Sequence, residues 1–216
     1  MGGLIKKRFD ESGYILMGWG DVGPVRIFSQ RPIRSLDDLR QTKLWMWSDD
    51  PLTKQLFAAL ELRGVPLGVP EVLPALSTGS IDAFFGSPLS AMVLQWSTHA
   101  KYVTSAVIGM ATGATVLTKK SWQSIAPADQ QIILEEGNKL EAAAIAQVRT
   151  DNTNALAAMK SRGLQEIPTP PEMQKEVVRR SMAIADKAGA QFSKEFQVET
   201  QKLLNEYRQA HPGELP

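Results

Sequence analysis

The sequence predicts an α/β fold in which a mixed sheet carries helices on both faces. From residue 14 to about residue 100, short apolar or aromatic runs alternate with helix-like segments, as in sheets with flanking helices. The second half of the chain consists mostly of strong helix formers, which indicates long C-terminal helices. Hydrophobic residues make up 43% and charged residues 22% of the 216 residues, as in ordinary globular domains.

Two strands joined by a turn are predicted at the start of this alternation. Residues 14–20 form an apolar run that ends in glycine, which is typical of a buried strand. Residues 21–24 carry the Asp, Gly and Pro of a turn. Residues 25–29 then alternate like a second strand, which ends before Pro32 because proline cannot donate to a strand ladder.

Two aromatic strands organise the segment 34–88. They lie at 43–47 and 81–85, and each is followed by loop residues and a helix. Because ligands in open α/β sheets bind beyond the carboxyl ends of the strands, we expect the functional site there. The elements predicted in this segment are a helix at 36–40 capped by Ser35, a strand at 43–47, a helix from Pro51 to Gly64 capped by Asp49 or Asp50, a strand at 65–69, a helix at 70–79, a strand at 81–85 and a helix from Pro88 to Trp96.

The C-terminal half changes character. Residues 101–118 are rich in β-formers, with Gly109 and Gly113 as expected bends or crossings. Helices are predicted at 127–162 and at 172–210, the second with a kink near Gly189.

Composition excludes several classes of site. The chain has no cysteine and only two histidines, so we expect no disulfide, no metal site and no Ser-His-Asp catalysis. The formal net charge of +1 gives no reason to expect a nucleic-acid partner. There is no apolar run of about 18 residues that could span a membrane. Residues 1–14 lack the apolar core of a signal peptide, and we expect none in this chain.

Several segments occur in an order that resembles a known family. They are RPIRSLDDLRQTKLW (31–45), EVLPALSTGSIDA (71–83), KYVT (101–104) and SWQSIAPADQQIILE (121–135), and a strand near Gly18 and a long helix frame them. Together, residues 13–210 resemble the C-terminal part of the DctP-type solute-binding proteins of TRAP transporters.

The resemblance implies a periplasmic-binding-protein-like fold, whose two lobes close on a small molecule. It implies an extracytoplasmic, periplasmic solute-binding subunit, not an enzyme, which binds no cofactor and delivers its ligand to TRAP membrane permease subunits. It also implies that lobe two is largely complete and lobe one truncated, because family members carry a further N-terminal segment. The expected divisions are 1–20, a crossing strand from lobe one; 21–108, the ligand-binding lobe two; and 109–216, a returning lobe-one strand and a C-terminal helical scaffold.

Two departures from the family pattern concern the ligand. The family's carboxylate-binding arginine falls on Trp45, and an asparagine of its second strand falls on Gly86. Losing a bidentate arginine removes charge-assisted contacts worth roughly 1.5–3 kcal/mol each, whereas tryptophan offers apolar surface. We therefore expect an apolar or aromatic-compatible ligand. Binding of an organic acid, as in typical relatives, stays open, since Arg26 lies near the family's other arginine position.

The candidate ligand-binding residues cluster at the ends of the predicted strands. Alternate strand residues face opposite sides, so Trp45 and Trp47 share a face while Phe84 and Phe85 do not, and one of that pair is expected in the core. Core packing is the competing interpretation for each aromatic residue. The set comprises Trp45, Trp47, Phe84, Phe85, Gly86, Trp19, Arg26 and Trp96.

Two other functions compete with solute transport. A sensor or interaction module would keep this scaffold, and its apolar surface or C-terminal helices would dock a partner or form a homodimer. A hydrolase or lyase lacks support, because the sequence has no nucleophile elbow, metal motif or paired acid and base.

Overall fold

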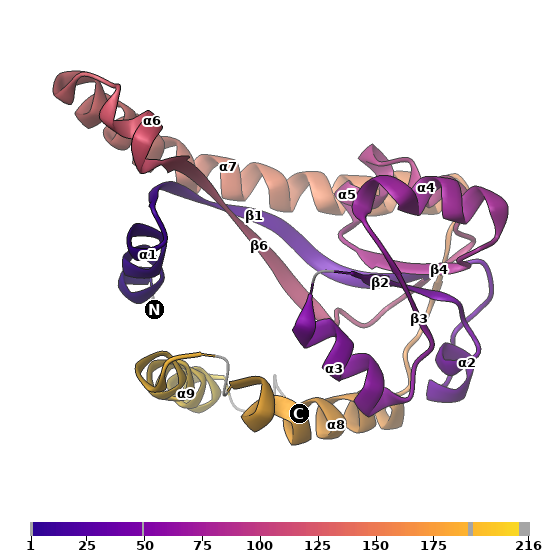
Figure 1. Cartoon of the computed structure of the whole chain (residues 1–216). Coiled ribbons are helices and arrows are strands. Elements are labelled where there is room, and N and C mark those ends of the chain that lie inside the picture. The colour runs from indigo at the N-terminus through magenta and orange to yellow at the C-terminus, as the bar shows by residue number, and fades with distance from the viewer. Residues whose placement is uncertain (1, 49, 190–191, 212–216) are drawn as a thin grey trace.

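The computed structural model describes residues 2–48, 50–189 and 192–211. The strands of this part form one mixed sheet in the order β3-β2-β4-β1-β5-β7, and β6 pairs with the extension of β1 in a long ribbon that leaves the sheet (Figure 1). The strands are β1 (Tyr14–Ser29), β2 (Leu44–Trp47), β3 (Gly64–Leu67), β4 (Ala83–Gly86), β5 (Tyr102–Thr104), β6 (Gly109–Thr118) and β7 (Gln165–Ile167).

Helices cover both faces of the sheet, which confirms the predicted fold class (Figure 1). Strands β2, β3 and β4 are parallel to one another, while β1 is antiparallel to β4 and β5. The helices are α1 (Gly2–Glu11), α2 (Leu36–Arg40), α3 (Pro51–Leu60), α4 (Val69–Thr78), α5 (Pro88–Val93), the 3-10 helix η1 (Trp96–His99), α6 (Lys119–Gln123), α7 (Pro127–Ser161), α8 (Pro171–Gly189) and α9 (Lys194–Ala210).

The predicted helix caps are confirmed at two positions. The Ser35 side chain accepts a hydrogen bond from the Asp38 N–H at 3.0 Å, and Asp50 Oδ1 accepts one from Leu52 N–H at 2.9 Å. Each side chain satisfies an N–H that lacks a partner within its helix. Asp49, the alternative cap, lies outside the described residues.

The predicted turn at 21–24 is wrong. β1 continues through it as one strand of 16 residues, paired with β6 from Tyr14 opposite Thr118 to Val25 opposite Gly109. The register shifts between Leu16 and Gly18 and again between Asp21 and Gly23. Turn residues also suit β-bulges, which absorb an extra residue without reversing the chain.

Other predictions about single elements need correction. α5 ends at Val93 and not at Trp96, because Gln95 has a left-handed backbone (φ 62°) and Trp96 then begins η1. Of the bends or crossings expected at Gly109 and Gly113, Gly113 lies inside the continuous strand β6, while Gly109 is its first residue. Residues 2–11 are helical, so only the end of the predicted crossing segment 1–20 is strand.

Two apolar clusters fill the two faces of the sheet. Phe28 and Phe84 lie in one cluster with side chains of α4, α5 and α7. Ile27 and Ala83 lie in the other with side chains of α2, α3 and α8. Neighbouring strand residues separate in this way because their side chains point to opposite faces.

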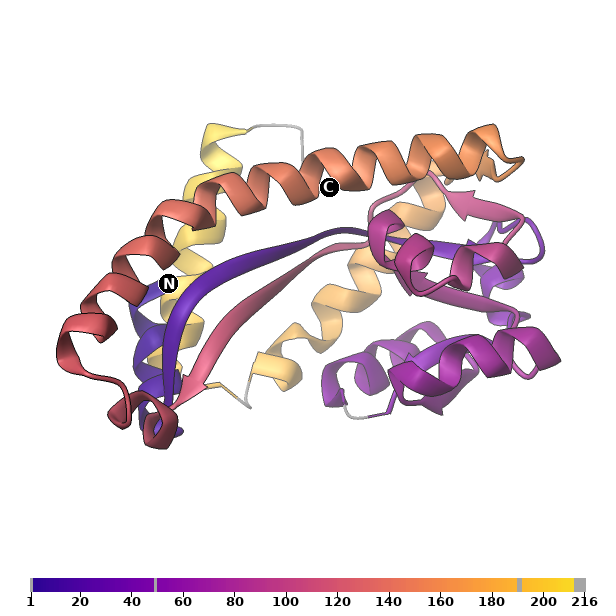
Figure 2. The same cartoon turned by 90° about the horizontal axis from the view of Figure 1, so that it is seen from above.

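α7 runs beside β1 along the ribbon and onto the sheet (Figure 2). Gly137 allows a close approach, since a Cβ there would lie 2.9 Å from the Met17 carbonyl oxygen. One turn later, Glu141 Oε2 accepts a hydrogen bond from the Trp19 N–H at 2.9 Å. Despite its length, α7 is not apolar enough to cross a bilayer, and the same is true of every helix in the described ranges.

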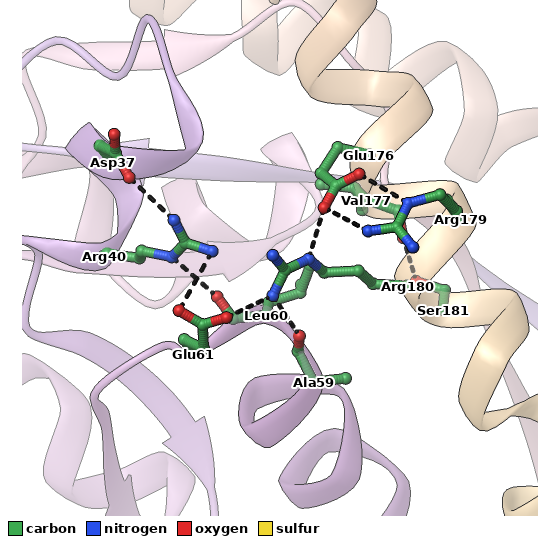
Figure 3. Close-up of polar contacts among 10 residues, drawn as sticks. All are labelled: Asp37, Arg40, Ala59, Leu60, Glu61, Glu176, Val177, Arg179, Arg180 and Ser181. Carbon is green, nitrogen blue, oxygen red and sulfur yellow. Dashed lines mark hydrogen bonds and ion pairs between the residues drawn. The ribbon is translucent and has the colours of Figure 1, made fainter.

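An ion-pair network fastens α8 to the end of α3 (Figure 3). Arg180 Nη1 donates to the Ala59 carbonyl at 2.8 Å and to Glu61 at 2.7 Å, and Arg40 Nε donates to the Leu60 carbonyl at 3.2 Å. The two cations thus meet the negative end of the α3 dipole.

Glu176 completes this network from within α8. Its carboxylate accepts hydrogen bonds from Arg179 and Arg180 at 2.6 to 2.8 Å. These arginines lower the pKa of Glu176 from 4.5 to about 2. The carboxylate is therefore charged under all ordinary conditions.

Candidate functional site

The parallel strands β3, β2 and β4 end at one edge of the sheet, which we call the carboxyl edge. Their last residues are Leu67, Trp47 and Gly86, and helices α4, α3 and α5 begin shortly after them. Such an edge is where open α/β sheets bind ligands.

Trp45 lies in β2, two residues before Trp47 at the carboxyl edge, and it is buried. Its side chain is only 4% exposed, and its Nε1–H donates to the Leu67 carbonyl at 3.0 Å. Its ring stacks on Phe85 with centroids 4.9 Å apart and meets Trp96 edge-on at 5.2 Å. Trp45 therefore supports the carboxyl edge from beneath, and its role as a ligand contact stays a prediction.

Trp47 and Phe85 form the accessible part of this aromatic group. Trp47 is 47% exposed, and its ring lies 6.5 Å from that of Trp45. Phe85 is half-buried and stacks on the same indole. We call Trp47 and Phe85, supported by Trp45, the aromatic face.

Phe84 and Trp96 belong to the core. Phe84 has no exposed surface and stacks on Phe28 with centroids 5.0 Å apart. Trp96 is 4% exposed and packs edge-on against Phe84 at 5.4 Å. Of the pair that the sequence left open, Phe84 is thus the buried residue and Phe85 the more accessible one.

Arg26 lies opposite Gly86 in the ladder of β1 and β4. Its Nη1 donates to the Thr104 carbonyl at 3.0 Å, the Ser105 carbonyl at 2.8 Å and Glu166 at 2.8 Å. Among the described residues, its buried Nε–H has no hydrogen-bond partner. The guanidinium is thus held next to the carboxyl edge through its Nη1 atom.

Glu166 offsets part of this charge. It also accepts a hydrogen bond from Lys160 at 2.7 Å. The pKa of Glu166 is lowered, and the hydrogen bond from Lys160 is the largest cause. Burial raises this pKa, while the hydrogen bond from Arg26 lowers it further. Glu166 is therefore ionised and holds Arg26 in place.

Gly86 and Trp19 complete the predicted set. A Cβ at Gly86 would meet no atom within 4 Å, so packing does not require glycine there. Trp19 lies on the ribbon opposite Ala114, with its ring 6.4 Å from Phe9. Seven residues of extended strand, roughly 23 Å, separate it from Arg26, so the structure does not bring Trp19 to the carboxyl edge.

The helix starts at the carboxyl edge are already capped. Asp50 caps α3, Glu71 accepts a hydrogen bond from the Gly68 N–H at 2.7 Å, and the Ser87 hydroxyl accepts one from the Ser90 N–H at 3.2 Å. Sequence reasoning missed Glu71, although an acid three residues after a helix cap is a recognised signal. These contacts occupy one backbone N–H at the start of each of the three helices.

Within the described residues, no group of three or more His, Asp or Glu side chains could hold a metal ion. His99 Nε2 lies 3.2 Å from the Ser77 hydroxyl, in a pair between the end of α4 and η1.

A hollow of about 630 Å³ lies away from the carboxyl edge. It opens between α1 and α9 and is lined by Gly3, Leu4, Lys194, Glu195, Val198 and Glu199. None of the predicted site residues contributes to it.

Comparison with known proteins agrees with this architecture. The model of the family described as bacterial extracellular solute-binding protein, family 7 (DctP), matches residues 1–191. DctP7 of Bordetella pertussis, an extracytoplasmic solute receptor binding pyroglutamic acid, is 24% identical with a TM-score of 0.83, over 96% of this chain and 67% of its own.

Two further solved structures have the same fold. A TRAP periplasmic solute-binding protein of Ralstonia eutropha H16, with bound (S)-2-acetolactate, is 21% identical with a TM-score of 0.85, over 95% of this chain and 67% of its own. The TRAP periplasmic solute-binding protein of Haemophilus influenzae RdAW, with bound L-gulonate, is 18% identical with a TM-score of 0.85, over 95% of this chain and 66% of its own. The chain spans between 62% and 67% of the length of such proteins.

Proposed function

This chain belongs to family 7 of the bacterial extracellular solute-binding proteins, and we propose that it is the extracytoplasmic solute-binding subunit of a TRAP-type secondary transporter. The family match over residues 1–191 is the observation that carries this proposal. The family consists of receptors rather than enzymes, and we infer the same for this chain. The proposed location is the periplasm and the proposed partners are TRAP membrane permease subunits.

The proposed ligand is a small organic molecule that lays an apolar or aromatic surface on the aromatic face. Trp47 is half exposed at the carboxyl edge, and Trp45 beneath holds Trp47 and Phe85 in a fixed orientation. A preorganised aromatic surface binds flat apolar groups at low entropic cost.

A simple organic acid is the second candidate. Relatives were solved with bound acids, among them D-glucuronate in the Pseudomonas putida F1 protein. In this chain Arg26 is a cation next to the carboxyl edge, held by Glu166, and a carboxylate ligand would meet its positive charge there.

Calorimetry distinguishes the two candidates. We expect an aromatic monocarboxylate such as phenylacetate to bind more tightly than D-glucuronate. The substitution Trp47→Ala should weaken phenylacetate binding by roughly tenfold, which corresponds to the loss of about one aromatic contact. Val93→Ala, which removes a 67% exposed apolar side chain on α5, is the control. Tight binding of D-glucuronate without binding of apolar acids would contradict the apolar proposal and favour the second candidate.

The alternative roles of this scaffold remain predictions. Apolar side chains on α9 are exposed, Val198 by 69% and Tyr207 by 46%, and such a surface would suit a homodimer. Light scattering of the purified chain decides its oligomeric state. A permease gene beside the gene for this chain would favour transport, whereas a signalling gene would favour a sensor.

A further inference from the structure

β1 belongs to both the sheet and the ribbon. Residues 26–29 of β1 pair with β4, whereas its part from Tyr14 to Val25 pairs with β6. The register shift between Asp21 and Gly23 lies next to this change of partner. Because a bulge bends its strand, this position sets the direction in which the ribbon leaves the sheet.

One buried side chain of α7 holds this bulge. Asn152 is 2% exposed, and its Nδ2 donates to the Val22 carbonyl at 3.0 Å and to the Val148 carbonyl at 2.9 Å. Its Oδ1 accepts a hydrogen bond from the Leu89 N–H at 3.0 Å. A buried amide with its donors and its acceptor in use has a fixed orientation.

Gly23 provides the space that Asn152 occupies. Its φ of +109° is strained for residues with a side chain. A Cβ there would lie 2.3 Å from Asn152 Nδ2 and 2.8 Å from Asn152 Cγ. The bulge and the asparagine therefore fit one another.

The third partner of Asn152 belongs to the carboxyl edge. Leu89 is the second residue of α5, which begins two residues after Gly86, the end of β4. Its N–H is one of those that a helix leaves without an internal partner. Through one planar amide, the start of α5 is thus joined to the bulge of β1.

We infer that Asn152 is a positioning residue that couples the carboxyl edge to the bend of β1. A ligand that shifts the start of α5 would move the Asn152 amide and, with it, the Val22 carbonyl. The ribbon would then change direction relative to the sheet. The inference uses the proposed function only in placing the ligand at the carboxyl edge.

The coupling is measurable without any ligand. The chain has no cysteine, so Lys54→Cys on α3 and Lys120→Cys on α6 allow one pair of spin labels, whose separation reports the angle between sheet and ribbon. We expect Asn152→Ala to widen the distance distribution roughly twofold, because the bend loses its constraint. Asn154→Ala, the same change at an exposed position of α7, should leave it unchanged. Equal widths in the two variants would overturn the inference.

Hydrogen exchange gives a second, local readout. The Leu89 amide should lose protection by roughly tenfold or more in Asn152→Ala, while the amides of β4 keep theirs. Uniform loss of protection would instead indicate a purely structural role and contradict the coupling.

A double-mutant comparison tests the contact with the bulge. Gly23→Ala should lower the melting temperature strongly alone and less when Asn152→Ala is also present, because the steric conflict is removed. Additive changes would contradict the proposed fit. Phenylacetate, the ligand that the proposed function favours, serves as the probe. If the unmodified chain does not bind it, the apolar-ligand proposal fails, while the ligand-free distances still decide the role of Asn152.

Discussion

The two halves of β1 are held by different interactions. In the sheet, Phe28 is fully buried and stacks on Phe84, and Ile27 on the opposite face is 5% exposed. In the ribbon, the strand meets α7 through polar contacts. Trp19 N–H donates to Glu141, and the Arg149 Nε donates to Asp21 at 2.9 Å.

The two halves therefore depend on different kinds of contact. Aromatic packing fixes side chains at close to crystal density, so any shift leaves a void. In the ribbon half, a few polar pairs join β1 to α7. The sheet half of β1 thus fixes the carboxyl edge by packing, whereas the direction of the ribbon depends on those pairs.

The largest expected effect comes from breaking the sheet half. Phe84→Ala should lower the free energy of unfolding by about 3–5 kcal/mol, because it empties a fully buried site between Phe28 and Trp96. Urea unfolding measures the change. Trp47→Ala, which truncates a half-exposed ring, should cost much less, and an equal loss would show that the aromatic face is itself part of the core.

A smaller effect is expected where α7 touches the ribbon. Gly137→Ala should destabilise by about 1–3 kcal/mol despite the better helix propensity of alanine, because its Cβ would press on the Met17 carbonyl. Gly3→Ala in α1, where the Cβ would meet no atom within 4 Å, should stabilise slightly. Thermal unfolding of both variants checks the opposite signs. If Gly137→Ala also stabilised the chain, the contact between α7 and β1 would have room for an added Cβ.

The smallest effect concerns the ion-pair network of α8. The folded pKa of Glu176 is depressed from 4.5 to about 2, so its contribution is present above pH 4.5 and is lost as the pH falls toward 2. Glu176→Gln should flatten the decline of melting temperature over this range. Glu172→Gln, at an 84% exposed side chain of the same helix, is the control. An unchanged pH profile in Glu176→Gln would show that the network does not stabilise the fold.

Local signals predicted much of the fold. Ser35 and Asp50 cap helices as their residue types indicate, and β2, the strand after the first of these helices, is aromatic and short. The same signals failed at 21–24, because glycine, proline and aspartate suit both a turn and a bulge. Pairing with β6, a strand about ninety residues away in sequence, decided between the two.

Side-chain roles at the site were predictable only in part. The strand period separated Phe84 from Phe85, but it did not show which of them is buried, since that depends on Phe28 and Trp96. Trp45 marked the right location, yet the structure places it beneath the carboxyl edge with its indole bonded to Leu67. Asn152 gave no sequence signal, because α7 also contains Asn138 and Asn154 and nothing along the chain distinguishes the three.

By itself, the sequence determined the alternation of strands and helices, the concentration of aromatic residues at two strand ends and the likeness to a solute-binding family. These properties depend on neighbours along the chain, where period and capping act. Only the tertiary structure decided that β1 is one bulged strand, that Trp45 supports Trp47 and Phe85, and that Asn152 joins α5 to the bulge. Those contacts join distant segments, and their geometry follows from packing rather than from local propensity.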